Sequence, residues 1–261
     1  MPPKLRSSPL AWLLAVGLAS AAGLRAQVTE TPQTMGFGRA QVRMEAISLG
    51  VAPDTSAPNQ YKALGLGTLL VSAGLTNTVD LQVGTQLYVR ETFSSAGTDQ
   101  TRSGIGSITV RPKWTFWSDP SSGQQAAIIP YVILPSHSGG TGSKSTQGGI
   151  ILPWSADLPA GAKAAAMLEW DALRNEADTR YDSRLYGSAY VKWALGQLLS
   201  AYAETTLSES TAGSSTFSGT VGGGATLSLS KDFEWDYEIG KVLGPGRNSW
   251  MQILRFRWRL F

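Results

Sequence analysis

The sequence predicts an all-β protein, an antiparallel transmembrane β-barrel of about 12 strands. Three observations lead to this fold class. Apolar and polar residues alternate along most of the chain after residue 26, which is the period of a strand with two unlike faces. No run of about 20 apolar residues follows that position, so helical spans are not expected. The 29 Gly and 9 Trp, with only 16% charged residues, favour strands and turns.

The first 26 residues have the order of a secretory signal peptide. Two basic residues precede an apolar stretch from Leu10 to Ala22, and small residues then lead to Ala26. We expect cleavage after Ala26, with cleavage near Ala21 as the alternative. The predicted organisation is a signal peptide at 1–26, an N-terminal segment at 27–38 and the outer-membrane barrel at 39–261.

The alternation is clearest between Leu81 and Val89. Every second residue there, up to Leu87 and Val89, belongs to one mostly apolar row, which predicts that these residues share one face of a strand. Gln82 and Gln86 belong to the opposite, polar row. The same pattern recurs around residues 163–171 and 184–193. Applied to the whole chain, it predicts strands near 39–49, 61–74, 79–90, 104–117, 126–135, 148–157, 162–173, 181–194, 198–208, 216–229, 233–243 and 250–261.

The predicted connections differ in length. Short ones at 75–78, 158–161, 195–197 and 230–232 are separated by longer, Gly-, Ser- and Thr-rich ones such as 91–103 and 136–147. The connection at 118–125 is longer than a tight turn and breaks this regularity. Outer-membrane barrels have tight periplasmic turns and longer outer loops, so the pattern favours this class.

Tryptophans near the predicted strand ends are candidates for a lipid-facing girdle, because aromatic rings gather where a membrane meets water. The alternative is a soluble sandwich or lipocalin-like barrel whose tryptophans fill a core. An export signal followed by apolar faces on nearly every strand favours the membrane. The girdle candidates are Trp114, Trp154, Trp170, Trp193, Trp235 and Trp258.

Charged residues alternate with large apolar ones in the last predicted hairpin. One antiparallel register pairs Glu238 with Arg255, Asp236 with Arg257 and Glu234 with Arg259, all on one face. Arg facing lipid near mid-bilayer costs about 2–4 kcal/mol, so this face is expected to line the lumen. The alternative is the solvated face of a soluble hairpin. The lumen-lining candidates of the whole chain are Arg111, Lys113, Glu169, Asp171, Lys192, Glu234, Asp236, Glu238, Arg255, Arg257 and Arg259.

Glu169 and Asp171 share a strand face and could suggest acid–base chemistry, although pairing with Lys163 or Lys192 is the preferred explanation. With no cysteine and one histidine, no metal site and no cofactor are expected. Charges of both signs are scattered, so no nucleic-acid partner is expected.

Three stretches resemble a known family, the outer-membrane transporters associated with the meta-pathway of phenol degradation. They are Gly74-Leu75-Thr76-Asn77-Thr78-Val79-Asp80-Leu81, Ile128-Ile129-Pro130-Tyr131-Val132-Ile133-Leu134-Pro135, and Gly148-Gly149-Ile150-Ile151-Leu152-Pro153 with Asp157-Leu158-Pro159. The resemblance extends from about Arg39 to the C-terminus and implies uptake of small hydrophobic or aromatic compounds. Phe261 resembles the C-terminal aromatic of outer-membrane barrels, although Arg259 takes a position that is usually aromatic.

The sequence therefore predicts a passive channel or transporter of the bacterial outer membrane, not an enzyme, with lumen charges that set its electrostatic preference. Expected partners are outer-membrane lipids, a small-molecule solute and the outer-membrane assembly machinery. Two alternatives stay open. One is a rim-active lipid hydrolase that uses His137, between Ser136 and Ser138 in an outer loop. The other is a non-conducting barrel for adhesion or envelope structure.

Overall fold

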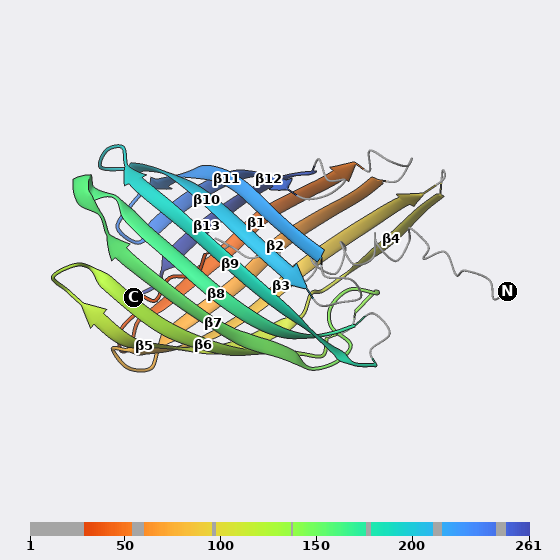
Figure 1. Cartoon of the computed structure of the whole chain (residues 1–261), viewed down its shortest axis with the longest axis horizontal. Helices are drawn as coiled ribbons and strands as arrows, with labels where there is room; N and C mark the ends of the chain where they lie inside the picture. The colour runs from red at the N-terminus through yellow and green to blue at the C-terminus, as the bar shows by residue number, and fades with distance from the viewer. Residues whose placement is uncertain are drawn as a thin grey trace.

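The chain forms one antiparallel sheet that closes into a barrel, as a computed structural model shows (Figure 1). The only helical element in the described part is a short 3-10 turn at Pro159–Gly161, and no helix there is long and apolar enough to cross a bilayer. The predicted fold class is confirmed. The structure describes residues 29–53, 60–95, 98–136, 138–175, 179–210, 216–243 and 249–261, so the predicted signal peptide and His137 lie outside the described residues.

The strands follow one another around the wall. Their bounds are β1 Ala40–Pro53, β2 Gln60–Gly74, β3 Val79–Ser95, β4 Thr98–Gly104, β5 Ile108–Asp119, β6 Gln124–Leu134, β7 Gln147–Asp157, β8 Lys163–Arg174, β9 Tyr181–Ala194, β10 Leu199–Ser210, β11 Thr216–Ser228, β12 Phe233–Leu243 and β13 Ser249–Arg259. The pairing of β1 with both β2 and β13 closes the wall. Both β4 and β5 pair with β3, β4 along Val89–Ser95 and β5 along Val79–Gly84. The two strands therefore occupy one position in the wall, so that 13 strands fill 12 positions.

Two predicted connections are wrong. The stretch 91–103, expected to be an outer loop, is mostly strand, because β3 continues to Ser95 and pairs with β4. Its polar, β-branched residues suit a strand that faces water, and the hydroxyls of Thr92 and Thr101 lie 3.2 Å apart across the hairpin. The connection at 118–125 is a tight turn after all, because Asp119 accepts hydrogen bonds from Ser121 and Ser122.

The short connections gather at one end of the barrel, which we call the short-turn end. They are 75–78, 120–123, 158–162, 195–198 and 229–232. The predicted positions of all but 120–123 are confirmed to within one residue. In an outer-membrane barrel this end faces the periplasm.

The outer wall is apolar and the inner wall is mostly polar. In β8, Leu168 is 59% exposed and Trp170 is also exposed, whereas Met167, Glu169 and Asp171 between and beside them are buried. All six girdle candidates are exposed on the outer face, by 38% to 54%. Their place at the membrane–water interface stays a prediction.

The sequence predicted that Leu87 and Val89 both face outward. Leu87 does, with 53% of its surface exposed, but Val89 is only 2% exposed and faces inward. A bulge causes this change. The pairing of β1 with β13 shifts between Glu45 and Ile47, and at the same level Gly67 of β2 has a φ of 65°. An extra residue in a strand reverses which residues face inward beyond it.

The predicted register of the last hairpin is wrong by two residues. Glu234 lies opposite Arg257 and Asp236 opposite Arg255, while Glu238 lies opposite Ile253. Closure of the barrel fixes this register, because β13 also pairs with β1, where Gln41 lies opposite Arg259. A shift of two leaves each residue on the same side of its strand, so alternation could not detect it.

Candidate functional site

The N-terminal segment Thr29–Gly38 enters the barrel from the short-turn end, and its first residues are the centre of the candidate site. Thr29, Glu30 and Pro32 are almost fully buried, although they precede the first strand and belong to no strand themselves. They contact side chains from opposite parts of the wall, including Arg111 of β5, Met167 of β8 and Glu204 of β10. Only a segment in the lumen can reach these strands together.

Backbone contacts with the β2–β3 turn hold the base of the segment at the short-turn end. The Met35 N–H donates to both oxygens of Asp80, at 3.0 and 3.1 Å, and the Phe37 N–H donates to Asn77 Oδ1 at 3.2 Å. Gly36, with a φ of 85°, passes so close to Gly74 that a Cβ on Gly74 would lie 1.8 Å from the Gly36 carbonyl oxygen. Glycine is therefore required for this approach.

Glu30 binds cations from two parts of the wall. Arg43 Nη2 lies 3.1 Å from each carboxylate oxygen, and Arg111 Nη2 lies 2.6 Å from Oε1. Burial raises the pKa of the Glu30 carboxyl, but the positive charges of Arg111, Arg43 and Lys113 together lower this pKa well below its ordinary value. Glu30 is therefore an ionised carboxylate within a positive site.

Lys113 and Thr115 of β5 bind the backbone of the same segment. Lys113 Nζ donates to the carbonyl oxygens of Thr31 and Gln33 at 2.9 and 3.2 Å, and the Thr115 hydroxyl donates to the Pro32 carbonyl at 2.5 Å. The carbonyl groups of an extended segment outside a sheet make no backbone hydrogen bonds. The bonds from Lys113 and Thr115 therefore satisfy carbonyl groups that would otherwise be buried without a hydrogen bond.

The tip of the segment reaches the opposite wall. The Thr29 N–H donates to Glu204 Oε1 at 2.8 Å, and the Thr29 hydroxyl lies 2.6 Å from the same oxygen and 2.7 Å from Ser188 Oγ. The Glu30 N–H donates to the Met167 sulfur at 3.2 Å. The segment thus spans the short-turn half of the lumen from β5 to β10.

A second cluster centres on Arg255. Its guanidinium lies 2.7 Å from Asp236 Oδ1, 2.5 Å from Glu238 Oε2 and 3.9 Å from Glu45 Oε1. The Tyr202 hydroxyl, from β10, donates to Asp236 across β11. Gly224 of β11 makes this reach possible, because a Cβ there would lie 2.5 Å from the Tyr202 hydroxyl oxygen.

A third cluster contains Glu169 and Asp171, but not with the predicted partners. Asp171 pairs with Arg184 at 2.5 Å, and the Tyr131 hydroxyl donates to both acids. Lys163 instead pairs with the exposed Asp157, and Lys192 donates to Thr226 at 3.0 Å. The pairing with lysine fails because the next strand brings Arg184 opposite Asp171.

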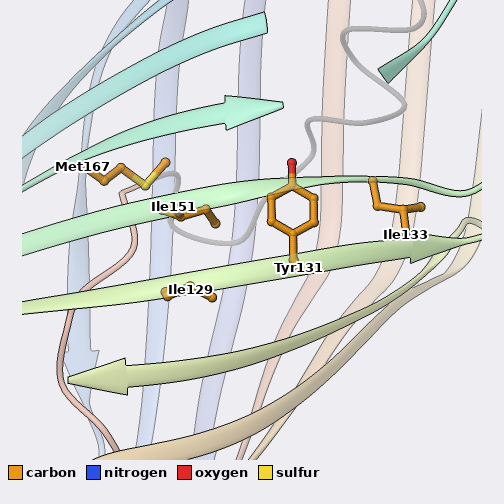
Figure 2. Packing of buried hydrophobic residues seen from close by; sticks show 5 residues of the cluster. All are labelled: Ile129, Tyr131, Ile133, Ile151 and Met167. Atoms are coloured by element: carbon orange, nitrogen blue, oxygen red, sulfur yellow. The ribbon is translucent and has the colours of Figure 1, made fainter. Parts of the chain in front are cut away.

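An apolar patch covers part of the inner wall next to these acids. It is made by buried side chains of β6, β7 and β8, which Figure 2 shows on neighbouring strands: Ile129, Tyr131, Ile133, Ile151 and Met167. Met167 joins the patch to the N-terminal segment through the Glu30 N–H. The inner wall therefore carries both charged and apolar side chains, and these apolar ones are buried.

A small cavity of about 50 Å³ lies on the β9–β13 side. Its lining includes Arg43, Tyr190, Lys192, Tyr202, Asp236 and Arg257. The rings of Tyr190 and Tyr202 meet edge to face, with centroids 6.5 Å apart. The segment thus fills one side of the short-turn half and leaves space on the other.

The structure places the predicted lumen residues as follows. The inner wall holds Arg111, Lys113, Glu169, Asp171, Glu238 and Arg255 as buried side chains and Lys192, Glu234, Asp236 and Arg257 as half-buried ones, with Arg257 paired to Glu234. Arg259 differs, because it is exposed at the short-turn end and donates to the Lys231 carbonyl at 2.7 Å. The shift of the hairpin register by two residues moves it past the start of β12. The role of these residues as a pore lining stays a proposal.

Sequence reasoning missed several residues that build the site. Thr29 and Glu30 lie in the segment at 27–38, which has no alternation and received no role. The other missed residues are Arg43, Glu45, Asp80, Tyr131, Arg184, Tyr202 and Glu204. The alternation does place Arg43, Glu45 and Glu204 on strands, and a count of all inward charges would have found them.

The closed 12-position wall, its apolar exterior and its charged lumen define an outer-membrane β-barrel. Residues 26–260 match the family described as "Putative MetA-pathway of phenol degradation", and the chain belongs to this family. The family predicted from sequence is confirmed. No curated protein matches the chain.

Solved structures with a similar fold are outer-membrane proteins. The COG4313 outer membrane channel from Pseudomonas putida F1 has a TM-score of 0.61 at 13% identity, over 87% of this chain and 97% of that one. The translocator domain of the autotransporter NalP from Neisseria meningitidis has a TM-score of 0.55 at 13% identity, over 96% and 97%. The NanC porin has a TM-score of 0.51 at 11% identity, over 82% and 100%. The predicted location in the bacterial outer membrane is confirmed by this fold.

Proposed function

We propose that the barrel is an outer-membrane channel for passive passage of small solutes, narrowed by its own N-terminal segment. The observation that carries the proposal is the course of the N-terminal segment from the short-turn end into a closed wall, where it crosses the lumen from β5 to β10 beside a small cavity of about 50 Å³. A barrel of this size has little interior space, so a segment within it decides how much of the lumen a solute can use.

The solute path that we propose runs along β9–β13, where the small cavity lies. Lys192, Asp236 and Arg257 place charges of both signs on it, and most of these charges are already paired. A lining of paired charges keeps water in the channel without strong attraction for one sign of ion. The protein filters solutes and carries out no turnover.

The inner apolar patch supports small aromatic solutes as the cargo. Ile129, Ile151 and Met167 place buried apolar side chains on the inner wall, where a purely ionic pore needs none. The name of the family refers to phenol degradation, which is consistent with aromatic cargo. Outer-membrane lipids and the assembly machinery remain the expected partners.

The test is the conductance of the purified mature protein in planar lipid bilayers. A matched variant lacks residues 27–35 and keeps Gly36–Gly38 before β1. We expect a small conductance for the wild type and a several-fold larger one for the variant, because the segment no longer fills the short-turn half. Unheated gel migration checks that both barrels fold.

Two outcomes would count against the proposal in different ways. Equal conductance of the two folded proteins would remove the role of the segment. No conductance from either would favour the structural or adhesion barrel. The hydrolase alternative has no support among the described residues, since His137 lies outside them.

A further inference from the structure

The cations around Glu30 form the most complete ligand-like site in the lumen. Glu30 supplies the carboxylate, Arg43 and Arg111 bind it, and Lys113 contributes a third positive charge. The paired side chains are shielded from water, with side-chain exposures of 13% for Arg43, 8% for Arg111 and 4% for Glu30. Two guanidinium groups on one carboxylate are a strong and geometrically specific arrangement.

The wall supplies the cations, whereas the segment supplies the anion. Arg43 lies on β1, and Arg111 and Lys113 lie on β5, so the barrel holds all three in place. Lys113 also binds two carbonyls of the segment, and Asp80 is the wall carboxylate whose charge acts on it. When the segment moves away, the positive site therefore loses its carboxylate and two acceptor oxygens together. The position that Glu30 leaves would still face Arg43, Arg111 and Lys113, and their positive charges would favour another carboxylate there.

Buried apolar side chains lie directly beside this positive site. The Glu30 N–H contacts the sulfur of Met167, and Met167 packs with Ile129 and Ile151 on the inner wall. A ligand with a carboxylate at one end and a flat apolar body at the other would place its charge at the cations and its apolar body against Met167, which the segment contacts. Sulfur and aliphatic groups also make favourable contacts with aromatic rings.

We propose that Arg43, Arg111 and Lys113 form a binding site for the carboxylate of a small aromatic acid, and that Glu30 occupies this site as an internal substitute. A solute carboxylate that takes the place of Glu30 releases the tip of the segment and widens the path. This inference rests on the proposed channel function and adds a class of solute and a means of opening.

The first test measures binding of radiolabelled benzoate to the detergent-solubilised protein by equilibrium dialysis. Glu30→Ala empties the site, and we expect it to bind benzoate at least tenfold more tightly than the wild type. Adding Arg111→Gln to Glu30→Ala should remove this gain. Glu30→Gln keeps the side-chain shape and repeats the test if the alanine variant does not fold. Asp157→Asn, which removes an exposed carboxylate at the short-turn end, should bind like the wild type.

Two other probes separate the parts of the site. Benzyl alcohol, which keeps the ring without the charge, should bind Glu30→Ala at least tenfold more weakly than benzoate. Acetate, which keeps the charge without the ring, should also bind more weakly. Equal binding of benzoate to the wild type and Glu30→Ala, or unchanged binding after Arg111→Gln, would overturn the proposal. Equal binding of acetate and benzoate would overturn the aromatic part.

Conductance distinguishes this failure from failure of the channel function. If Glu30→Ala conducts more than the wild type but binds no benzoate, the channel stands and the ligand site falls. If neither protein conducts, the channel function falls. With both correct, millimolar benzoate raises wild-type conductance several-fold and leaves that of Glu30→Ala nearly unchanged.

Discussion

Replacing Arg255 with methionine tests whether the lumen charges hold the barrel together. Arg255 lies 2.7 Å from Asp236, 2.5 Å from Glu238 and 3.9 Å from Glu45. Glu45 and Glu238 are 0% and 1% exposed, so water cannot replace the guanidinium. Methionine keeps most of the side-chain volume and removes the charge. Leaving a buried partner without its counter-ion costs about 3–5 kcal/mol, and we expect a loss of that size in the free energy of unfolding.

The assay is urea unfolding in lipid vesicles, followed by tryptophan fluorescence. Glu238→Gln added to Arg255→Met should recover part of the loss, because it removes one of the isolated carboxylates. Arg180→Met is the matched control, since Arg180 is 63% exposed in its pair with Asp182 and should unfold close to the wild type. If Arg255→Met loses less than about 1 kcal/mol, the carboxylates are not isolated from water and the argument fails.

Three further predictions concern the segment, the inner wall and the outer wall. Because cations lower the pKa of Glu30 below 4.5, its bond to the wall is complete above that pH and is lost only as the pH falls through the lowered value. The conductance ratio of Glu30→Gln to the wild type should therefore stay constant from pH 8 to about 5, and a ratio that falls to one near pH 6 would contradict this. Gly224→Ala should destabilise the barrel by about 1–3 kcal/mol in urea unfolding, because its Cβ meets the Tyr237 carbonyl oxygen at 2.3 Å. Gly196→Ala, where a Cβ meets nothing within 4 Å, should have no such effect. Leu168→Arg, in the middle of β8, should lose about 2–4 kcal/mol in vesicles, whereas the same change at Leu195 in a short turn should lose much less.

The faces of the wall could be predicted because they depend on a local property. Alternation with a period of two assigns each residue to lipid or lumen without knowledge of its neighbours. It fails where a strand gains a residue, as at Ala46, since nothing in the composition there marks a bulge. The wrong prediction for Val89 concerns β3, whereas the extra residue lies in β1. An extra residue in one strand therefore also changes which residues face inward on the strands paired beside it.

Register was harder to predict than face, and the last hairpin shows why. Both the predicted register and the observed one place acids and arginines together inside the barrel. The energy that separates them comes from β1, which fixes Arg259 opposite Gln41 and leaves Arg255 within reach of two acids. A hairpin considered alone contains no information about a strand that precedes it by 180 residues or more in the sequence.

The two ends of the N-terminal segment differ in how much the sequence could predict about them. Its base rests on Gly74, Asn77 and Asp80, which belong to one of the stretches that carry the family resemblance. The sequence alone predicts only a tight turn for these residues. In the structure they also bind the base of the N-terminal segment. The tip depends on Arg43 and Arg111, 13 and 81 residues away from Glu30, and on Glu204, 175 residues away from Thr29. A short local motif can therefore encode how the base of the segment is bound. The contacts of the tip form only when the barrel wall has closed, so Glu30, a single glutamate in an irregular segment, has no sequence pattern that would indicate its role.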